Sequence, residues 1–119
     1  MHYYAVIFFW LVCGHFLCDY ALQSQFIADA KNPFKGLPGI PWIWPMAAHC
    51  FIHGAVVAKI TGSVFLGIVE IVLHFYCDFR KCWELSKREI YEPEGLFHVD
   101  QIVHILGKVI ILIGLRMGL

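Results

Sequence analysis

The chain has 119 residues, no net charge with its histidines neutral, and 60% hydrophobic against only 15% charged residues. Its length predicts a single domain over residues 1–119. Soluble domains have about 45–50% apolar and about 25% charged residues, so this composition predicts an integral membrane protein whose partner is the lipid bilayer. The sequence has no large basic cluster, which excludes nucleic acid as an expected partner.

The first predicted helix covers about residues 3–28, which is long enough to cross ~30 Å of hydrocarbon at ~1.5 Å per residue. The chain has no basic segment at its start and no small-residue cleavage site, so we interpret this helix as a retained span and not as a signal peptide. His15, Asp19 and Gln23 follow at intervals of four and are expected on one stripe of the helix. The Gly/Pro-rich segment 35–41 then forms a loop.

Three more helices are predicted, over about residues 45–60, 63–87 and 96–118. A tight turn at residues 61–63 joins the first two of these, and the charged stretch 87–95 forms a solvent loop before the last. The predicted fold class is therefore all-α, a four-helix transmembrane bundle. The motif His-Phe-x-Cys-Asp occurs in the first and third helices and suggests two pseudo-repeated helical hairpins.

Each predicted helix carries two histidine or aspartate residues four positions apart, which places both side chains on one helical face. The helices alternate in direction, and the pairs lie roughly 17–24 Å from one membrane side or 6–12 Å from the other, a common depth in a ~30 Å core. We therefore expect the eight side chains to meet in one layer. They are His15 and Asp19, His49 and His53, His74 and Asp78, and Asp100 and His104.

A layer of ionisable side chains in a membrane predicts bound metal. Each such side chain costs at least ~2.5–3.5 kcal/mol on insertion scales, and a divalent cation compensates because carboxylates and neutral imidazoles are its natural ligands. Eight ligands are too many for one tetrahedral ion and suit two ions bridged by an aspartate. Zinc is the favoured ion, with manganese and iron as alternatives. A lone histidine in a membrane helix more often hydrogen-bonds a neighbouring helix, and only the four pairs together favour a metal.

Further polar side chains are expected around the metal layer. We assign catalytic roles to Asp78, Asp19, Lys81 and Gln23, with metal-bound hydroxide as the nucleophile and an uncoordinated aspartate as general base. A cationic rim beside two metals suits a phosphate-bearing substrate, although lysine and arginine at a membrane interface also serve as ordinary topology signals. The side chains predicted to bind or orient the substrate are Gln23, Lys31, Arg80, Lys81 and Gln101.

Several polar or reactive residues leave alternatives open. Glu70 lies one helical turn from His74 and is either a ligand or the hydrogen-bonding partner of a ligand. The five cysteines have no C-x-x-C spacing and predict packing residues, not disulfides, but Cys18 and Cys77 adjoin aspartates and stay alternative ligands. The motif Gly114-x-x-x-Gly118 favours helix contacts and suggests a homo-oligomer.

These patterns predict an intramembrane metal-dependent hydrolase acting on a phosphoester or a lipid-linked phosphate. Two alternatives are an ion, metal or proton transporter that uses the same layer, and a non-catalytic adaptor stabilised by metal. The apolar segments 3–12 and 110–115 favour a pocket open to one side over a transport path. Lysines and arginines are more frequent near the layer, which predicts a bacterial inner membrane with this side cytoplasmic and both termini periplasmic.

Four stretches of the chain also resemble a known family: HFLCDYALQSQFIADAK, a central histidine, HFYCDFRK and DQIVH. The pattern is similar to small bacterial and phage membrane proteins of domain-of-unknown-function family 3307, and it covers most of the chain. The resemblance implies a membrane architecture and a polar site but no reaction, and the choice of His53 depends on helical spacing. The residues on family motif positions are His15, Asp19, Gln23, Lys31, His49, His74, Asp78, Lys81, Asp100, Gln101 and His104.

Overall fold

The computed structural model describes residues 2–87 and 93–119. Every regular element in these two ranges is helical, which confirms the predicted all-α class. The elements are α1 (His2–Phe16), the π-helical turn η1 (Leu17–Ala21), α2 (Gln25–Ala30), α3 (Ile43–Thr61), α4 (Val64–Lys87) and α5 (Pro93–Arg116). The last three correspond to the helices predicted over 45–60, 63–87 and 96–118. Residues 88–92 of the predicted solvent loop lie outside the described ranges.

The single first helix predicted over residues 3–28 is wrong in its second half. The backbone widens into η1, has no regular structure at residues 22–24, and starts again as α2. Ser24 is extended, and its hydroxyl accepts a hydrogen bond from the N–H of Ile27 at 3.3 Å, which is an N-cap. The Gln23 side-chain amide donates to the backbone carbonyl of Asp19 at 3.3 Å. These local side-chain bonds replace helical ones and interrupt the helix.

The α3–α4 hairpin depends on three glycines. Gly62 ends α3 with a φ of 75°, a left-handed conformation that glycine adopts without steric cost. Gly54 and Gly67 then face one another where the two helices pack. A Cβ atom on either glycine would lie 2.7 Å from the carbonyl oxygen of the other. The missing side chains therefore allow a backbone approach that brings the polar faces of α3 and α4 together.

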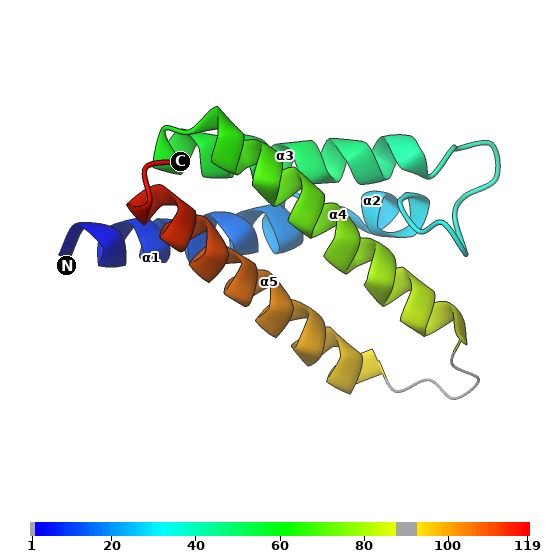
Figure 1. The fold of residues 1–119 in the computed structure, drawn as a ribbon. Helices are drawn as coiled ribbons and strands as arrows, with labels where there is room; N and C mark the ends of the chain where they lie inside the picture. Colours follow the sequence, from blue (N-terminus) through cyan, green and yellow to red (C-terminus); the bar gives the residue numbers. More distant parts are fainter. Residues whose placement is uncertain (1, 88–92) are drawn as a thin grey trace.

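Figure 1 shows both chain termini at the end of the molecule where α3 turns into α4. The connection between α2 and α3 lies at the opposite end. Near the termini, buried apolar side chains from the long helices form a packed cluster of Ile7, Leu11, Val57, Leu66 and Ile111. This cluster closes one end of the interior, and the polar residues lie beyond it.

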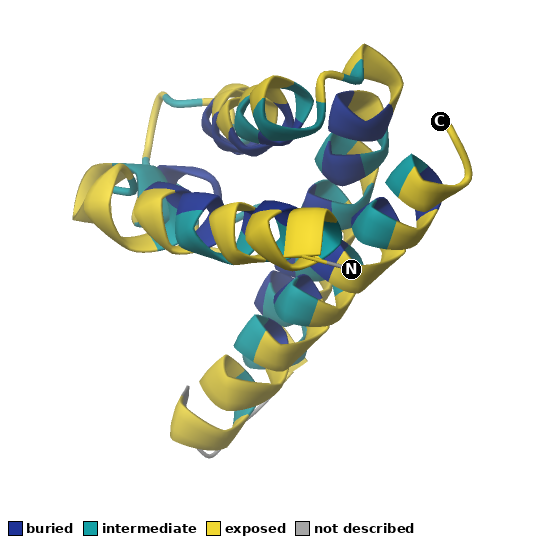
Figure 2. Ribbon diagram, turned by 90° about the vertical axis from the view of Figure 1, so that its left-hand side faces the viewer, coloured by how far each residue is buried: buried dark blue, intermediate teal, exposed yellow. Residues whose placement is uncertain are grey.

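Compared with a soluble protein, this chain has more polar side chains at buried positions and more large hydrophobic side chains at exposed positions. Within the described residues, ten buried side chains are polar or charged, as many as are hydrophobic. Large hydrophobic side chains such as Phe51, Val64 and Val72 are exposed, and Figure 2 shows the buried faces turned inward. Soluble monomers rarely expose so much apolar surface. This surface suits contact with lipid.

Three helical segments are long and apolar enough to span a membrane: His2–Ala21, Ile43–Thr61 and Glu94–Arg116. They suggest an integral membrane protein, as predicted from the composition. α4 is long enough but carries a polar face that includes Glu70, His74 and Asp78, and it is not one of the three. The four-span bundle therefore stays a prediction.

Candidate metal centre

All eight predicted metal ligands lie together in three overlapping groups. Within each group, one nitrogen or oxygen atom of every residue lies within 4.8 Å of the others. His74 belongs to the first two groups and Asp78 to the last two, so the groups form one continuous cluster, which we call the His/Asp centre. The groups are His15, Asp19, His53 and His74; His49, His74 and Asp78; and Asp78, Asp100 and His104.

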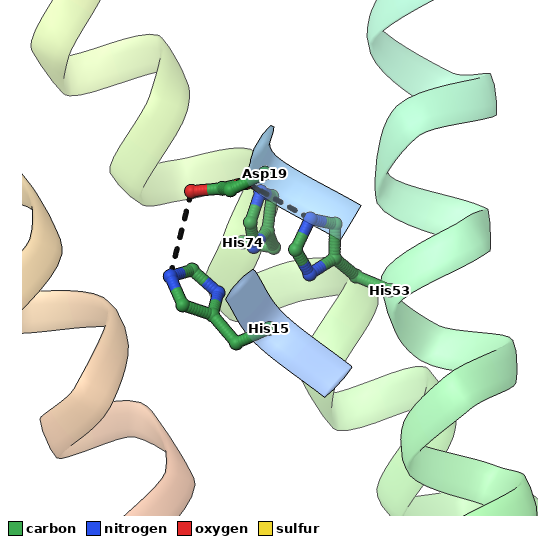
Figure 3. A group of neighbouring side chains, drawn as sticks. All are labelled: His15, Asp19, His53 and His74. Carbon is green, nitrogen blue, oxygen red and sulfur yellow. Dashed lines mark hydrogen bonds and ion pairs between the residues drawn. The ribbon is translucent and has the colours of Figure 1, made fainter. Parts of the chain in front are cut away.

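Asp19, on the π turn, is the hub of the first group. Its Oδ1 lies 3.0 Å from Nε2 of His53, 3.3 Å from Nε2 of His49 and 3.6 Å from Nε2 of His74. Its Oδ2 lies 3.4 Å from Nε2 of His15. Figure 3 shows the side chains of His15, His53 and His74 gathered around this carboxylate. π turns inside helices occur frequently at functional sites, and here one carries the aspartate that most of the histidines approach.

Asp78, on α4, connects the other two groups. Its Oδ2 lies 3.6 Å from Nε2 of both His49 and His74, and its Oδ1 lies 3.4 Å from Nε2 of His104. The same nitrogen of His104 lies 3.4 Å from Oδ1 of Asp100. Each of the five histidines in the centre therefore presents its Nε2 atom to an aspartate.

These distances fit a bound cation. Nitrogen and oxygen ligands about 2.1 Å from a tetrahedral ion lie about 3.4 Å from one another, and the contacts above range from 3.0 to 3.6 Å. Asp78 Oδ1 and His104 Nε2 are buried, and no described residue offers either atom a hydrogen bond. Unpaired buried polar atoms are costly, and a cation between these two would satisfy both. The centre can therefore hold a metal ion.

Both lysines predicted to bind substrate contact carboxylates of the centre. Lys31 follows α2, and its buried ammonium group contacts Asp78. Lys81 Nζ lies 2.9 Å from Oδ2 of Asp100 and 3.5 Å from Oδ1 of Asp78. Both lysines thus reach the carboxylates directly and do not form a rim above them. Their positive charges offset part of the negative charge of the aspartates.

A buried ion pair between Glu70 and Lys108 lies next to the centre. The Glu70 carboxylate is also 3.5 Å from Nδ1 of His74, the nitrogen that faces away from Asp19. A carboxylate in this position favours a proton on Nδ1 and leaves Nε2 free to bind metal. Glu70 belongs to none of the three groups, and its role as a ligand or as the partner of a ligand stays a prediction.

Lys108, next to the centre, is not among the site residues predicted from the sequence. The spacing of four that identified the His/Asp pairs continues to it on α5 and to its partner on α4. The two series are Asp100, His104 and Lys108, and Glu70, His74 and Asp78. Glu70 is recognised by this spacing in the sequence, and the same spacing, applied to lysine as well as to histidine and aspartate, also indicates Lys108.

Gln101 connects α5 to the π turn. Its side-chain nitrogen donates to Oδ2 of Asp19 at 3.1 Å and lies 3.4 Å from Oδ2 of Asp100. Its side-chain oxygen is 3.2 Å from Nε2 of His15. It therefore orients groups of the centre, which is one of the two roles predicted for it.

The remaining predicted residues lie outside the centre. Gln23 bonds to the backbone of Asp19, and Arg80 is half-exposed and pairs with Glu84 at 3.0 Å. The cysteines in the described ranges are all free, as predicted, and the three metal-binding groups contain none of them. Gly114 packs inside the chain, where an added Cβ would lie 2.9 Å from the Leu66 side chain. That packing accounts for Gly114 without self-association, which stays a prediction.

A family model described as "Protein of unknown function (DUF3307)" matches residues 7–118. The chain belongs to the DUF3307 family. This confirms the resemblance that the polar motifs suggested, and the whole His/Asp centre lies within the matched range of this DUF3307 protein. No curated protein and no solved structure matches the chain.

Proposed function

We propose that this DUF3307 protein is an intramembrane metal-dependent hydrolase that holds two divalent cations in the His/Asp centre and cleaves a phosphate ester. The observation that carries the proposal is the sharing of His74 and Asp78 between neighbouring ligand groups. Two ions joined by a shared carboxylate lie about 3.5–4 Å apart, close enough to act on one substrate. Zinc is the favoured ion because it accepts mixed nitrogen and oxygen ligands, and manganese and iron are the alternatives.

The charge of the centre favours an anionic substrate. With neutral histidines, its four carboxylates and three ammonium groups leave one negative charge. Two divalent cations convert this to three positive charges, and buried charge needs a counter-charge. A phosphate ester supplies one. The groups counted are Asp19, Glu70, Asp78, Asp100, Lys31, Lys81 and Lys108.

The chain's own residues would bind the phosphate, orient the ligands and accept a proton. Two bound ions would activate water and stabilise charge on the phosphate. Lys31 and Lys81 approach Asp78 from two elements and can transfer their hydrogen bonds to phosphate oxygens when cations hold the carboxylate. Gln101 keeps Asp19 and the first histidine in place. An aspartate oxygen that binds no cation serves as general base.

Packing near the termini supports a hydrolase over a transporter. An ion or proton path needs polar groups across the whole membrane. Here the polar network ends at the Glu70–Lys108 pair, and the neighbouring Leu11, Leu66 and Ile111 are at most 2% exposed. The centre is therefore closed toward that end, and a one-sided pocket is the arrangement expected of an enzyme.

The proposal includes a topology. α4 forms the fourth span, the membrane is a bacterial inner membrane, and the termini lie in the periplasm. Two observations support this. Both termini lie at one end of the molecule, and the α2–α3 connection and the C-terminal end of α4 lie away from it (Figure 1). That connection contains Lys35, and the last turns of α4 contain Arg80 and Lys87. Lys31 and Lys81 belong to the centre and count less as topology signals, and Arg88 lies outside the described residues.

Elemental analysis of the detergent-purified protein, followed by a hydrolysis assay with a phosphate monoester, tests the function. We expect about two zinc, manganese or iron ions per chain, as in other two-metal sites, and hydrolysis that a chelator abolishes. His98, exposed and outside the three groups, gives the control His98→Ala, which should keep the metal that His104→Ala loses. A protein that stays metal-free after reconstitution at neutral pH contradicts the centre. Bound metal without hydrolysis contradicts the enzyme and favours a metal-stabilised adaptor.

A further inference from the structure

Two cavities lie in the seam between α4 and α5, and both touch the His/Asp centre. The first, of about 300 Å³, is lined in part by Lys81 and Asp100. The second, of about 240 Å³, is lined in part by His74 and His104. The cavities form one continuous surface, the α4/α5 groove, because they share Tyr76, Cys77 and Val103.

The α4/α5 groove has a charged end and an apolar end. At the first, Arg80 pairs with Glu84 and Lys81 pairs with Asp100. Leu106 and Ile110 line the second. From Asp100 to Ile110 the helix rises ~15 Å, which is half of a ~30 Å hydrocarbon core and so the depth of one lipid leaflet. More than half of the Leu106 and Ile110 side-chain surface is exposed, so the apolar end opens on the outer surface of the helices.

We propose that the α4/α5 groove binds a hydrocarbon chain of a phosphomonoester lipid, and that this substrate enters the His/Asp centre sideways from the bilayer. The inference rests on the proposed hydrolase function and adds the class of substrate and its route. Two features select the occupant. The His/Asp centre that the groove reaches would carry net positive charge with two divalent cations bound, which suits an anionic phosphate, and an apolar channel one leaflet deep suits an acyl chain. A lipid with a neutral headgroup matches only the second feature.

The groove also places the scissile bond. A chain lying along α5 brings the attached phosphate to Lys81 and Asp100, at the edge of the third ligand group. Hydrolysis there joins the water oxygen to phosphorus and breaks the bond between phosphorus and the lipid alcohol oxygen. That oxygen receives a proton, so the products are inorganic phosphate and a neutral lipid alcohol, which stays in the bilayer.

Gly107 offers a way to fill the groove without disturbing the fold. It lines the second cavity, and an added Cβ would meet no atom within 4 Å. Leucine at this position would occupy the space assigned to the acyl chain and is a better helix former than glycine. Gly95 provides the matched control, because it lies on the same helix, lines neither cavity and also faces open space.

Native mass spectrometry of the protein in detergent measures binding independently of catalysis. The probes are phosphatidic acid and phosphatidylcholine, offered to the wild type, Gly107→Leu and Gly95→Leu. We expect the wild type and Gly95→Leu to retain phosphatidic acid at least about fivefold better than phosphatidylcholine, and Gly107→Leu to lose about fivefold in retention, a difference of about 1 kcal/mol. Equal retention by Gly107→Leu and the wild type, or no preference for phosphatidic acid, overturns the inference.

A hydrolysis assay with the zinc-loaded protein separates the inference from the function on which it rests. Gly107→Leu should lower the rate of phosphatidic acid cleavage relative to that of water-soluble p-nitrophenyl phosphate about tenfold, equivalent to about 1.4 kcal/mol, and Gly95→Leu should leave both rates unchanged. If the wild type cleaves neither substrate, the proposed function fails while the binding result still tests the groove. If Gly107→Leu slows both reactions equally or neither, the lateral route fails while the hydrolase stands.

Discussion

Asp78 has more ionisable partners than any other carboxylate of the centre. Lys31 approaches it from the end of α2 and Lys81 from the next turn of α4, and Nε2 atoms of three histidines lie within 3.6 Å of it. The ammonium groups of the two lysines compensate the charge of Asp78 when no metal is bound. A metal ion that binds Asp78 would therefore have to displace these lysine–aspartate ion pairs. The lysines therefore act both as counter-ions of the metal-free centre and as candidate phosphate ligands.

Alanine at Asp78 should strip the metal. The substitution removes a predicted ligand shared by two groups and leaves Lys31 buried without its partner. Loss of a residue that only supports a metal ligand lowers metal affinity by about 10–100-fold, so we expect at least about a tenfold fall in metal content here. Elemental analysis of the purified variant measures this. Asp29→Ala, at an exposed aspartate of α2, is the control and should keep its metal. Full metal retention by Asp78→Ala would show that the ligand assignment is wrong.

The Glu70–Lys108 pair should behave as a coupled unit. Removing one partner of a buried ion pair costs about 3–5 kcal/mol, and replacing both with apolar residues is often close to neutral. We expect Lys108→Met to lower the thermal unfolding temperature strongly and Glu70→Leu/Lys108→Met to recover most of the loss. Thermal unfolding of the metal-free protein in detergent gives both values. A double variant as unstable as the sum of the single ones would contradict the pairing.

At the scale of elements, the repeated motif His-Phe-x-Cys-Asp adopts two backbones. The copy at residues 74–78 continues a regular α-helix, whereas the last three residues of the copy at 15–19 belong to the π turn Leu17–Ala21. The apolar periodicity predicted the long helices, because burial against neighbours dominates there. It could not predict the interruption after Ala21, because single hydrogen bonds from Gln23 and Ser24 decide that local competition.

The contrast between repeated sequence patterns and single side-chain contacts also explains how much of the site could be predicted. Histidines and aspartates at a spacing of four stood out because ionisable residues are rare in membrane helices, and the structure brings all eight together. The reach of Lys31 to Asp78 could not be predicted, because it depends on a long flexible side chain and on where the interrupted first helix ends. Arg80 carried the same charge and sequence context as Lys81 but points to Glu84.

The α3–α4 contact should tolerate no side chain at Gly67. A Cβ there would lie 2.7 Å from the Gly54 carbonyl oxygen and 2.9 Å from the Ala58 side chain. We expect Gly67→Val to cost about 1–3 kcal/mol through overpacking and to lower zinc content, because it separates His49 from His74. Thermal unfolding and elemental analysis report the two effects. Gly95→Val, into open space, is the control, and equal stability of the two variants would contradict the tight contact.

At the scale of the whole molecule, the four-span proposal requires both termini on one side of the membrane. Reporter fusions test this: alkaline phosphatase, active only in the periplasm, should be active at either terminus, and a fluorescent protein inserted at exposed Gly39 should fluoresce in the cytoplasm. Termini on opposite sides would contradict the four spans. Termini that are both cytoplasmic would contradict only the orientation and would move the centre to the periplasmic side.

The polar face of α4 has a consequence for how the chain is made. α4 carries Glu70 and Asp78 and is not among the segments apolar enough to span a membrane, so on its own it inserts less readily than the other long helices. Lys31 of the preceding segment is already synthesised when α4 leaves the ribosome, but Lys108, the partner of Glu70, is still to come. Under the proposed topology, α4 must wait at the translocon until α5 emerges. Insertion and assembly are then a single event, and a chain that ends before α5 leaves α4 outside the bilayer.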